Sequence, residues 1–292
     1  MTQSMALAHL HPGVCVGHVE ALWRYPVKSM LGERLQQFSV DSRGVVGDRS
    51  RAVWDGSTGK VASAKNPKRW ADLLRFQATY LDEPDAGQSL PPVRVRGPFR
   101  GLDAPDETLQ SDSPRLEAAL SAWFARPLRL LSEPPTGASL EQYWPRVEGR
   151  EFQDVTNDLV LPDGTFFDAC PIHALTTATL KRFRDLEPAL DFAVERFRPN
   201  LLIEPRGKTA GFVEEPWVGG VLAIGDTVRL RVDRDCPRCV ITTLPQGGLP
   251  EEMEILRATA RHNRVVAGIR LSVLTPGPVA EGDRIHWWPA EG

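Results

Sequence analysis

Short stretches of alternating apolar and polar residues dominate the early part of the chain. Residues 14–23 read Val-Cys-Val-Gly-His-Val-Glu-Ala-Leu-Trp, and comparable stretches follow at residues 35–40 and 50–54. Each stretch is bounded by Gly, Asp or Pro, which are typical of turns. Several short strands at this spacing indicate an antiparallel barrel or sandwich. Residues 1–14, which precede most of this pattern, are expected to form a disordered leader.

Three helices are expected among the strands. At residues 113–124, Ser113 is a suitable N-cap, Pro114 fits the first turn, and apolar side chains recur on one face. Two further helices are expected near residues 177–186 and 250–263. The apolar face of the first helix consists of Leu116, Ala119, Leu120, Trp123 and Phe124.

A polar, proline-rich stretch at residues 133–139 divides the chain into two halves. Because such stretches are typical of domain boundaries, we expect one domain at 15–135 and another at 140–290. In the second half, Gly-Asp pairs at 225–226 and 282–283 each precede alternating residues, as tight turns entering barrel strands do. The expected fold class is mainly β (α+β), with barrel-like domains and peripheral helices.

The composition limits the kind of partner and the compartment. The 292 residues carry a net charge of -3, and the 35 basic residues are dispersed along the chain. This argues against nucleic acid or an anionic membrane as the main partner. No run of eighteen apolar residues occurs, and the first residues lack the regions of a signal peptide, so we expect a cytoplasmic protein. In that compartment the four cysteines are expected to be thiols or metal ligands rather than disulfides.

The most distinctive chemistry lies in the run Cys-Pro-Arg-Cys at residues 236–239. Such a pair can be a redox dithiol, half of a zinc site, or one working thiol beside a bystander. A zinc site usually needs a second closely spaced pair of ligands, which the sequence does not contain. A thioredoxin-like dithiol opens a helix, but β-branched residues and then turn formers follow Cys239, so no helix is expected there. The dithiol interpretation is weakened and stays open.

Four other short motifs accompany this run. They are Tyr-Pro-Val-Lys-Ser at 25–29, Gly-Asp-Arg at 47–49, Phe-Asp-Ala-Cys-Pro at 167–171 and Phe-Arg-Pro-Asn at 197–200. Together with the Cys-Pro-Arg-Cys run, in this order, the set resembles MOSC-domain proteins that have an N-terminal β-barrel domain. This family includes the mitochondrial amidoxime-reducing component and its bacterial relatives. The resemblance covers nearly the whole chain and implies an N-terminal MOSC β-barrel domain followed by a MOSC β-barrel domain.

The resemblance implies a molybdenum cofactor, a molybdopterin whose dithiolene and one protein cysteine bind the metal. The family's ligand matches Cys239, and a soft thiolate suits molybdenum. Cys236 would then be a small apolar neighbour, or a residue that tunes or protects the site. Because the cofactor is anionic, its pocket should offer cations. The positions that match cofactor contacts in the family are Lys28, Ser29, Arg49, Arg198, Asn200 and Arg238.

The segment around Asp168 both follows the family and departs from it. Asp168 matches an aspartate beside the metal, where it would position a water or relay protons, and we take it as the second catalytic residue after Cys239. Relatives carry small hydroxyl residues after this aspartate, whereas this chain has Ala169 and Cys170, which puts the substrate specificity in doubt. Lys65 stands where relatives often have arginine. His173 is expected to be a satisfied interior histidine rather than a ligand.

The function that the resemblance implies is molybdenum-dependent reduction of N-hydroxylated compounds such as amidoximes and hydroxylamines. Since the sequence shows neither a ferredoxin-like domain nor a membrane anchor, we expect electrons from a separate donor protein. Two alternatives stay open. One is a cofactor-binding or sulfur-carrier protein without its own turnover. The other is a cofactor-free dithiol reductase that uses Cys236 and Cys239.

Overall fold

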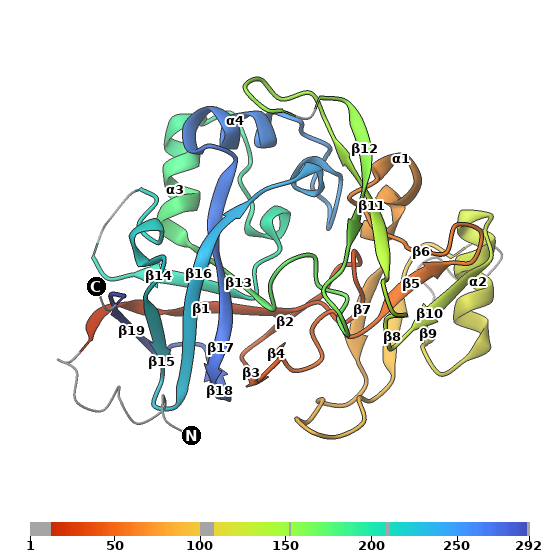
Figure 1. Cartoon of the computed structure of the whole chain (residues 1–292), viewed down its shortest axis with the longest axis horizontal. Helices are drawn as coiled ribbons and strands as arrows, with labels where there is room; N and C mark the ends of the chain where they lie inside the picture. Colours follow the sequence, from red (N-terminus) through yellow and green to blue (C-terminus); the bar gives the residue numbers. More distant parts are fainter. Residues whose placement is uncertain (1–12, 100–107, 152, 208–210, 291–292) are drawn as a thin grey trace.

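The structure, a computed structural model, describes residues 13–99, 108–151, 153–207 and 211–290. Its largest sheet contains a closed barrel of seven strands in the order β14, β13, β17, β16, β15, β19, β1, which the pairing of β1 with β14 closes. The barrel occupies one side of the molecule in Figure 1. Its strands are β1 (Val14–Arg24), β13 (Ile172–Thr176), β14 (Leu201–Pro205), β15 (Val221–Ile224), β16 (Val228–Pro237), β17 (Val266–Thr275) and β19 (Arg284–Trp288). This mainly β architecture confirms the predicted fold class.

The barrel closes around a core of branched apolar side chains. Along β16, Val228, Leu230 and Val232 point inward and are fully buried, as are Ile269 and Leu271 of β17. The residues between them face outward, because side chains alternate along a strand. The predicted Gly-Asp turns lie where expected, one between β15 and β16 and one just before β19.

Three smaller sheets form the rest of the β structure. In Figure 1 the five-stranded sheet lies beside the barrel, on the side of its β13 and β17 strands. Its strands, in spatial order, are β10 (Leu128–Leu131), β5 (Ala52–Asp55), β6 (Lys60–Val61), β11 (Ser139–Trp144) and β12 (Val155–Val160). The other sheets are β18 (Gly277–Ala280), β3 (Gln37–Asp41) and β4 (Gly44–Val45), and β7 (Gln77–Tyr80), β8 (Val93–Arg96) and β9 (Thr108–Gln110). Strand β2 (Glu33–Leu35) pairs with β1.

The helices lie on the periphery, as the sequence predicts. Helix α2 (Pro114–Phe124) begins where expected, and the Ser113 hydroxyl accepts a hydrogen bond from the Arg115 backbone N–H. Helices α3 (Thr177–Leu186) and α4 (Glu254–Asn263) cover one end of the barrel in Figure 1. Helix α4 ends where predicted but begins four residues later than the predicted start near position 250. A short helix, α1 (Pro67–Trp70), is also present.

The two halves of the chain are interleaved in space. Strand β1 pairs with β14 and β19, so the early part of the chain closes the barrel. Conversely, β11 and β12, which follow the proline-rich stretch, join the sheet that β5 and β6 begin, and β18 pairs with β3. The predicted leader falls almost entirely outside the described residues, and Val14 already belongs to β1. The division into domains at 15–135 and 140–290 stays a prediction.

Candidate functional site

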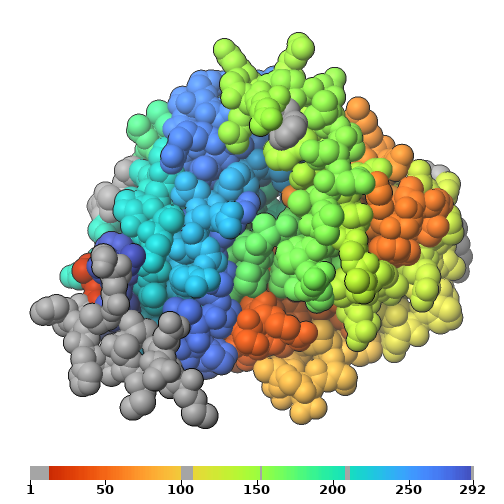
Figure 2. Space-filling view, in the orientation of Figure 1, coloured from red at the N-terminus to blue at the C-terminus, as the bar shows by residue number. Residues whose placement is uncertain are grey.

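One pocket lies between the barrel and the loops of the early part of the chain. It contains about 850 Å³ of space between atoms, counting the solvent at its opening. Figure 2 shows the surface hollowed near the middle of the molecule, between its blue and green parts. The pocket brings together every site residue predicted from the sequence. They are Lys28, Ser29, Arg49, Asp168, Arg198, Asn200, Arg238 and Cys239.

Asp168 is held between two lysines. Its Oδ1 atom lies 2.5 Å from Lys28 Nζ, and its Oδ2 atom lies 3.1 Å from Lys65 Nζ. Burial raises the pKa of Asp168, but the charges of Lys28 and Lys65 outweigh it and hold this pKa well below its usual range. Burial lowers the pKa of Lys28, which also donates to the Phe166 carbonyl oxygen at 2.6 Å. The carboxylate is therefore ionised at neutral pH and fixed in position.

The Gly-Asp-Arg motif is tied to the Tyr-Pro-Val-Lys-Ser motif by backbone and side-chain contacts. The Arg49 N–H donates to the Tyr25 carbonyl at 2.7 Å, and the buried Asp48 carboxylate accepts from the Tyr25 N–H at 2.7 Å and from the Arg49 guanidinium. Gly47 has a φ of +81°, and a Cβ atom there would lie 2.6 Å from the Tyr80 ring. The motif therefore needs glycine at its first position.

Tyr25 lies between two arginines of the pocket. The guanidinium carbons of Arg49 and Arg198 lie 4.6 and 4.3 Å from the centre of its ring, within the range of a cation–π interaction. Its hydroxyl donates to the Pro199 carbonyl at 3.2 Å. Tyr25 begins one of the five motifs but had no predicted role. In the structure it positions both guanidinium groups.

Three pocket residues have a backbone conformation that is unusual outside glycine. The φ angles of Ser29, Arg49 and Arg198 are +64°, +44° and +52°. A left-handed conformation in such residues costs about 1–3 kcal/mol and is concentrated at functional sites. Arg198 adopts it as the cap of the 3-10 helix η3 (Val194–Phe197), which turns its side chain toward the pocket. Ala125, Asp154, Arg264 and Val265 outside the pocket share this conformation, so it supports a functional site only together with the charges of the pocket.

The polar groups of Asn200 and Ser29 bind mainly to the protein. The Asn200 Oδ1 atom accepts from the His173 backbone N–H at 3.1 Å and from Arg49 at 3.4 Å, while its Nδ2 donates to the Trp23 carbonyl at 3.3 Å. The Ser29 hydroxyl accepts from the Ala64 backbone N–H at 3.1 Å. Both residues therefore organise the pocket wall, and their direct contact with a cofactor stays a prediction.

Arg238 connects Cys236 of the Cys-Pro-Arg-Cys run to His173 and to the Phe197 backbone. Its Nη1 donates to the Cys236 sulfur at 3.0 Å and lies 3.3 Å from His173 Nε2, while Nη2 donates to the Phe197 carbonyl at 2.6 Å. Burial opposes ionisation of Cys236, but His173 and Arg238 outweigh it, so the pKa of this thiol lies well below its usual value. These polar partners favour a tuning role for Cys236. His173 is buried, as expected, and it also lines the pocket.

The segment after Cys239 corrects one expectation. A single turn of 3-10 helix, η5 (Val240–Thr243), begins directly after Cys239, where no helix was expected. The Thr242 and Thr243 hydroxyls donate to the carbonyls of Cys239 and Val240 at 3.0 and 2.8 Å. These local bonds stabilise the turn despite the β-branched side chains. Among the described residues, no hydrogen bond involves the Cys239 sulfur, which lines the pocket.

One pocket residue, Arg270, carries no signal in the sequence, whereas Cys170 belongs to the Phe-Asp-Ala-Cys-Pro motif. Cys170, which departs from the family pattern, lines the pocket beside Ala169, and burial raises the pKa of its thiol to about 12. Arg270 of β17 also lines the pocket but belongs to no motif. Only its pairing opposite His173 on β13 brings it to the site. Pairing between distant strands was not predictable from the local pattern.

The donor set fits an anionic ligand that contains a soft metal. Six basic side chains line the pocket against one carboxylate, Asp168. Two buried donors, Arg198 Nη1 and Arg238 Nε, have no hydrogen-bond partner among the described residues. An unpartnered buried donor is costly, and both donors belong to residues of the pocket lining, so both are available to an acceptor on a bound ligand. In this part of the chain, no group of three or more His, Cys, Asp or Glu side chains could hold a metal ion by itself. The described helices are also too short or too polar to cross a membrane.

Two segments match known domain families. Residues 16–86 match the MOSC N-terminal beta barrel domain, and residues 162–286 match the MOSC domain. The chain is therefore a MOSC-domain protein with an N-terminal MOSC beta barrel domain, as its five motifs suggested. MOSC domains are associated with binding of the molybdenum cofactor.

Two mammalian proteins are similar to the chain along most of its length. Mitochondrial amidoxime reducing component 2 of Rattus norvegicus is 25% identical over 258 residues, which cover 82% of this chain and 71% of the rat protein. Mitochondrial amidoxime-reducing component 1 of Mus musculus is 24% identical over 309 residues, which cover 93% of this chain and 82% of the mouse protein.

Solved structures resemble the chain only distantly. The YUAD protein from Bacillus subtilis is 12% identical, with a TM-score of 0.47, over 94% of this chain and 97% of that protein. YiiM from Geobacillus stearothermophilus is 13% identical, with a TM-score of 0.32, over 41% of this chain and 54% of that protein.

Proposed function

We propose that the chain is a molybdenum-cofactor-dependent reductase of N-hydroxylated compounds such as amidoximes and hydroxylamines. The observation that carries this proposal is the gathering, in one basic pocket, of Cys239 with two buried arginine donors that no described residue satisfies. The names of the rat and mouse relatives support amidoximes as the substrate class.

In this proposal the pocket residues hold the cofactor through a thiolate and a set of cations. Cys239 ligates the molybdenum, because a soft thiolate suits this metal. Arg198 and Arg238 donate their free N–H groups to anionic or carbonyl oxygens of the cofactor, as guanidinium groups do with phosphate. Arg49 and Lys28 add positive charge nearby, while Ser29 and Asn200 fix the loops that present them.

When bound, the molybdenum supplies the two-electron chemistry that converts an N–OH group to N–H with release of water. That conversion consumes two protons, and the chain has groups that can hold them. Asp168 is ionised because its pKa is so low, so it is suited to orienting a water or a substrate N–H rather than to donating a proton. Lys28 Nζ, whose pKa burial lowers, is a better donor, and it lies 2.5 Å from Asp168.

The remaining partners follow from the same proposal. The substrate is a small N-oxygenated molecule that enters through the opening of the pocket. The electrons come from a separate donor protein, with neither nucleic acid nor a membrane as a partner, and the protein acts in the cytoplasm.

The test is metal analysis of the full chain expressed with cofactor biosynthesis intact. We expect about one molybdenum per chain in the unaltered protein and in Cys236→Ala, and almost none in Cys239→Ala, since only Cys239 is the ligand. Cys15→Ala, which alters a cysteine of β1 outside the pocket, is the matched control. Loss of metal in Cys236→Ala with retention in Cys239→Ala would overturn the ligand assignment.

An activity measurement separates the reductase from its alternatives. The loaded protein should reduce benzamidoxime with a chemical electron donor, and Cys239→Ala should not. A carrier protein would bind the cofactor and turn over nothing, while a dithiol reductase would lose activity equally in Cys236→Ser and Cys239→Ser whether or not molybdenum is present.

A further inference from the structure

A second hollow adjoins the pocket on the outer face of β16 and β17. It contains about 620 Å³ of space, counting open solvent, and is lined by Ala169, Cys170, Arg231, Asp233, Arg234 and Arg270. Three of these residues, Ala169, Cys170 and Arg270, also line the pocket that holds Cys239. The two hollows therefore share a wall, and a molecule could extend from one into the other.

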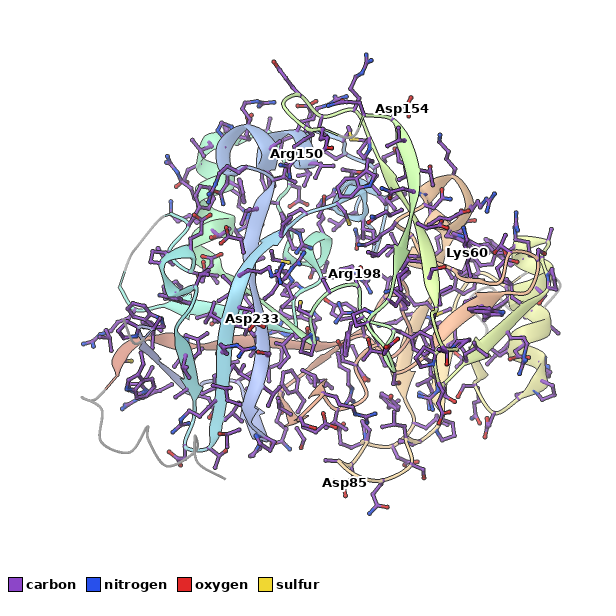
Figure 3. The ribbon with its side chains drawn as sticks, in the orientation of Figure 1. Lys60, Asp85, Arg150, Asp154, Arg198 and Asp233 are labelled. Carbon is purple, nitrogen blue, oxygen red and sulfur yellow. The ribbon has the colours of Figure 1, made fainter. Side chains whose placement is uncertain are left out.

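A β-bulge brings the arginines of this hollow onto one face. In the pairing of β16 with β17, Arg231 lies opposite Ser272, Val232 opposite Leu271, and Arg234 opposite Arg270. Asp233, labelled in Figure 3, is the extra residue of the bulge. Without it, strict alternation would place Arg231 and Arg234 on opposite faces. Bulges re-aim side chains in this way and are common next to active sites.

The resulting arrangement leaves positive charge unbalanced. Arg234 of β16 lies directly opposite Arg270 of the neighbouring strand β17. Like charges in such a cross-strand pair are destabilising. Among the described residues, neither side chain takes part in any hydrogen bond or ion pair with a carboxylate. The single carboxylate of the hollow, Asp233, is already bound to Arg231 at 2.7 Å and to the Ser272 hydroxyl at 3.0 Å. An anion placed between Arg234 and Arg270 would relieve the repulsion.

We propose that this hollow binds an anionic substituent of the substrate, a carboxylate or a phosphate, whose N-hydroxyl group lies in the adjoining pocket. The inference rests on the proposed function for the identity of that N-hydroxyl group. A guanidinium group can donate two parallel hydrogen bonds to two oxygens of a carboxylate or a phosphate. The substrates of this protein are then anionic N-hydroxylated compounds, and Arg234 and Arg270 select them over neutral ones.

The test compares three probes that differ only in the para substituent of the ring: para-carboxybenzamidoxime, para-phosphonobenzamidoxime and the neutral para-carbamoylbenzamidoxime. Calorimetry measures their binding to the full chain, and a chemical electron donor gives kcat/KM with the cofactor-loaded protein. We expect the favoured anion to exceed the neutral amide by about tenfold in both measurements, and to lose this preference in Arg234→Gln. Whichever anion shows the larger preference identifies the natural substituent. The preference should fall as salt is added, because exposed charges are screened.

Matched variants keep the result interpretable. Arg234→Lys retains a positive charge, so it should keep part of the preference for the anion that Arg234→Gln loses. Arg231→Gln alters a second arginine of the same hollow. Arg229→Gln removes an arginine of β16 that does not line it, and should keep the full preference. Arg234 is exposed, so its replacement should leave the fold intact.

The outcomes separate this inference from the proposed function. If no probe is reduced but the anions still bind in a way that depends on Arg234, the reductase proposal fails and the anion site stands. If all three probes bind and react equally, and Arg234→Gln changes nothing, the anion site is overturned while the reductase stands. If binding of every probe is unchanged but Arg234→Gln slows electron transfer from a protein donor for all of them, the hollow is instead a docking surface for that donor, and the proposal is overturned.

Discussion

The two walls of the Cys239 pocket hold their positive charges in different ways. The N-terminal wall, formed by Lys28, Arg49 and Lys65, is matched by protein carboxylates. In the barrel wall, formed by Arg198, Arg238 and Arg270, the first two guanidinium groups donate to backbone carbonyls and leave one N–H each without a partner among the described residues. No described carboxylate forms an ion pair with any of the three.

This difference assigns different tasks to the two walls. A buried ion pair that is complete supports the fold, and losing one partner is strongly destabilising. A buried charge without a partner costs stability and persists where a ligand completes it. The N-terminal wall therefore contributes more to stability, and the barrel wall offers more of the free donors for binding. Replacing residues of each wall should separate stability from binding.

Asp48→Asn should have the largest effect on stability. The Asp48 side chain is fully buried and bonds both the Arg49 guanidinium and the Tyr25 N–H. Removing its charge leaves the partly buried Arg49 guanidinium without a carboxylate partner, which should lower the free energy of unfolding by about 3 kcal/mol. Urea unfolding followed by circular dichroism measures this. Asp41→Asn, which alters a surface pair with Arg43, is the control and should cost less than about 1 kcal/mol.

Asp168→Asn should lower the free energy of unfolding by about 1–2 kcal/mol at pH 7, less than Asp48→Asn because Asp168 is partly exposed. Since the pKa of Asp168 is lower in the folded protein than in the unfolded chain, its stabilisation is present above the ordinary aspartate pKa of about 3.9 and disappears as the pH falls below it. Urea midpoints of the two proteins from pH 7 to pH 2 should converge in acid. A constant difference would show that charge is not the cause.

Tyr25→Phe tests a residue that contacts both walls. It keeps the ring between Arg49 and Arg198 but removes the hydroxyl that donates to the Pro199 carbonyl. The loss of one buried hydrogen bond should cost about 1 kcal/mol in urea unfolding. Molybdenum content should stay near that of the unaltered protein, since the ring positions the guanidinium groups. Loss of the metal in this variant would show that the hydroxyl itself is needed at the site.

Arg198→Met should change stability least and binding most. Burial lowers the pKa of Arg198 to about 10, so this guanidinium is costly to bury, and its replacement should alter the free energy of unfolding by less than about 1 kcal/mol. Molybdenum content per chain, measured by mass spectrometry, should fall at least about tenfold because a cofactor contact is lost. A loss of several kcal/mol in stability without loss of metal would contradict the division between the walls.

The sequence predicted those parts of the fold that depend on local patterns. Helices α2 and α3 and the two Gly-Asp turns follow from periodicity, caps and turn residues close together in the chain. The eight site residues came from motifs, and the structure gathers them in one pocket. Arg270 could not be predicted, because only the pairing of β17 with β13 and β16 brings it to the site. The turn η5 was missed because threonine hydroxyls that bond backwards outweigh the β-branched pattern.

The pairing of β1 with β19 also has a consequence for how the protein folds. Val14 lies opposite Trp287, so the barrel closes only after nearly the whole described chain has been synthesised. Contacts between residues so far apart in sequence form slowly, because a long loop must close before they contribute stability. Until then the side chains of β1 that belong in the barrel core lack their neighbours, and the edge of β1 that pairs with β19 is free. Both features favour association with other chains. The yield of folded protein should therefore depend on how long the early strands wait for the last one.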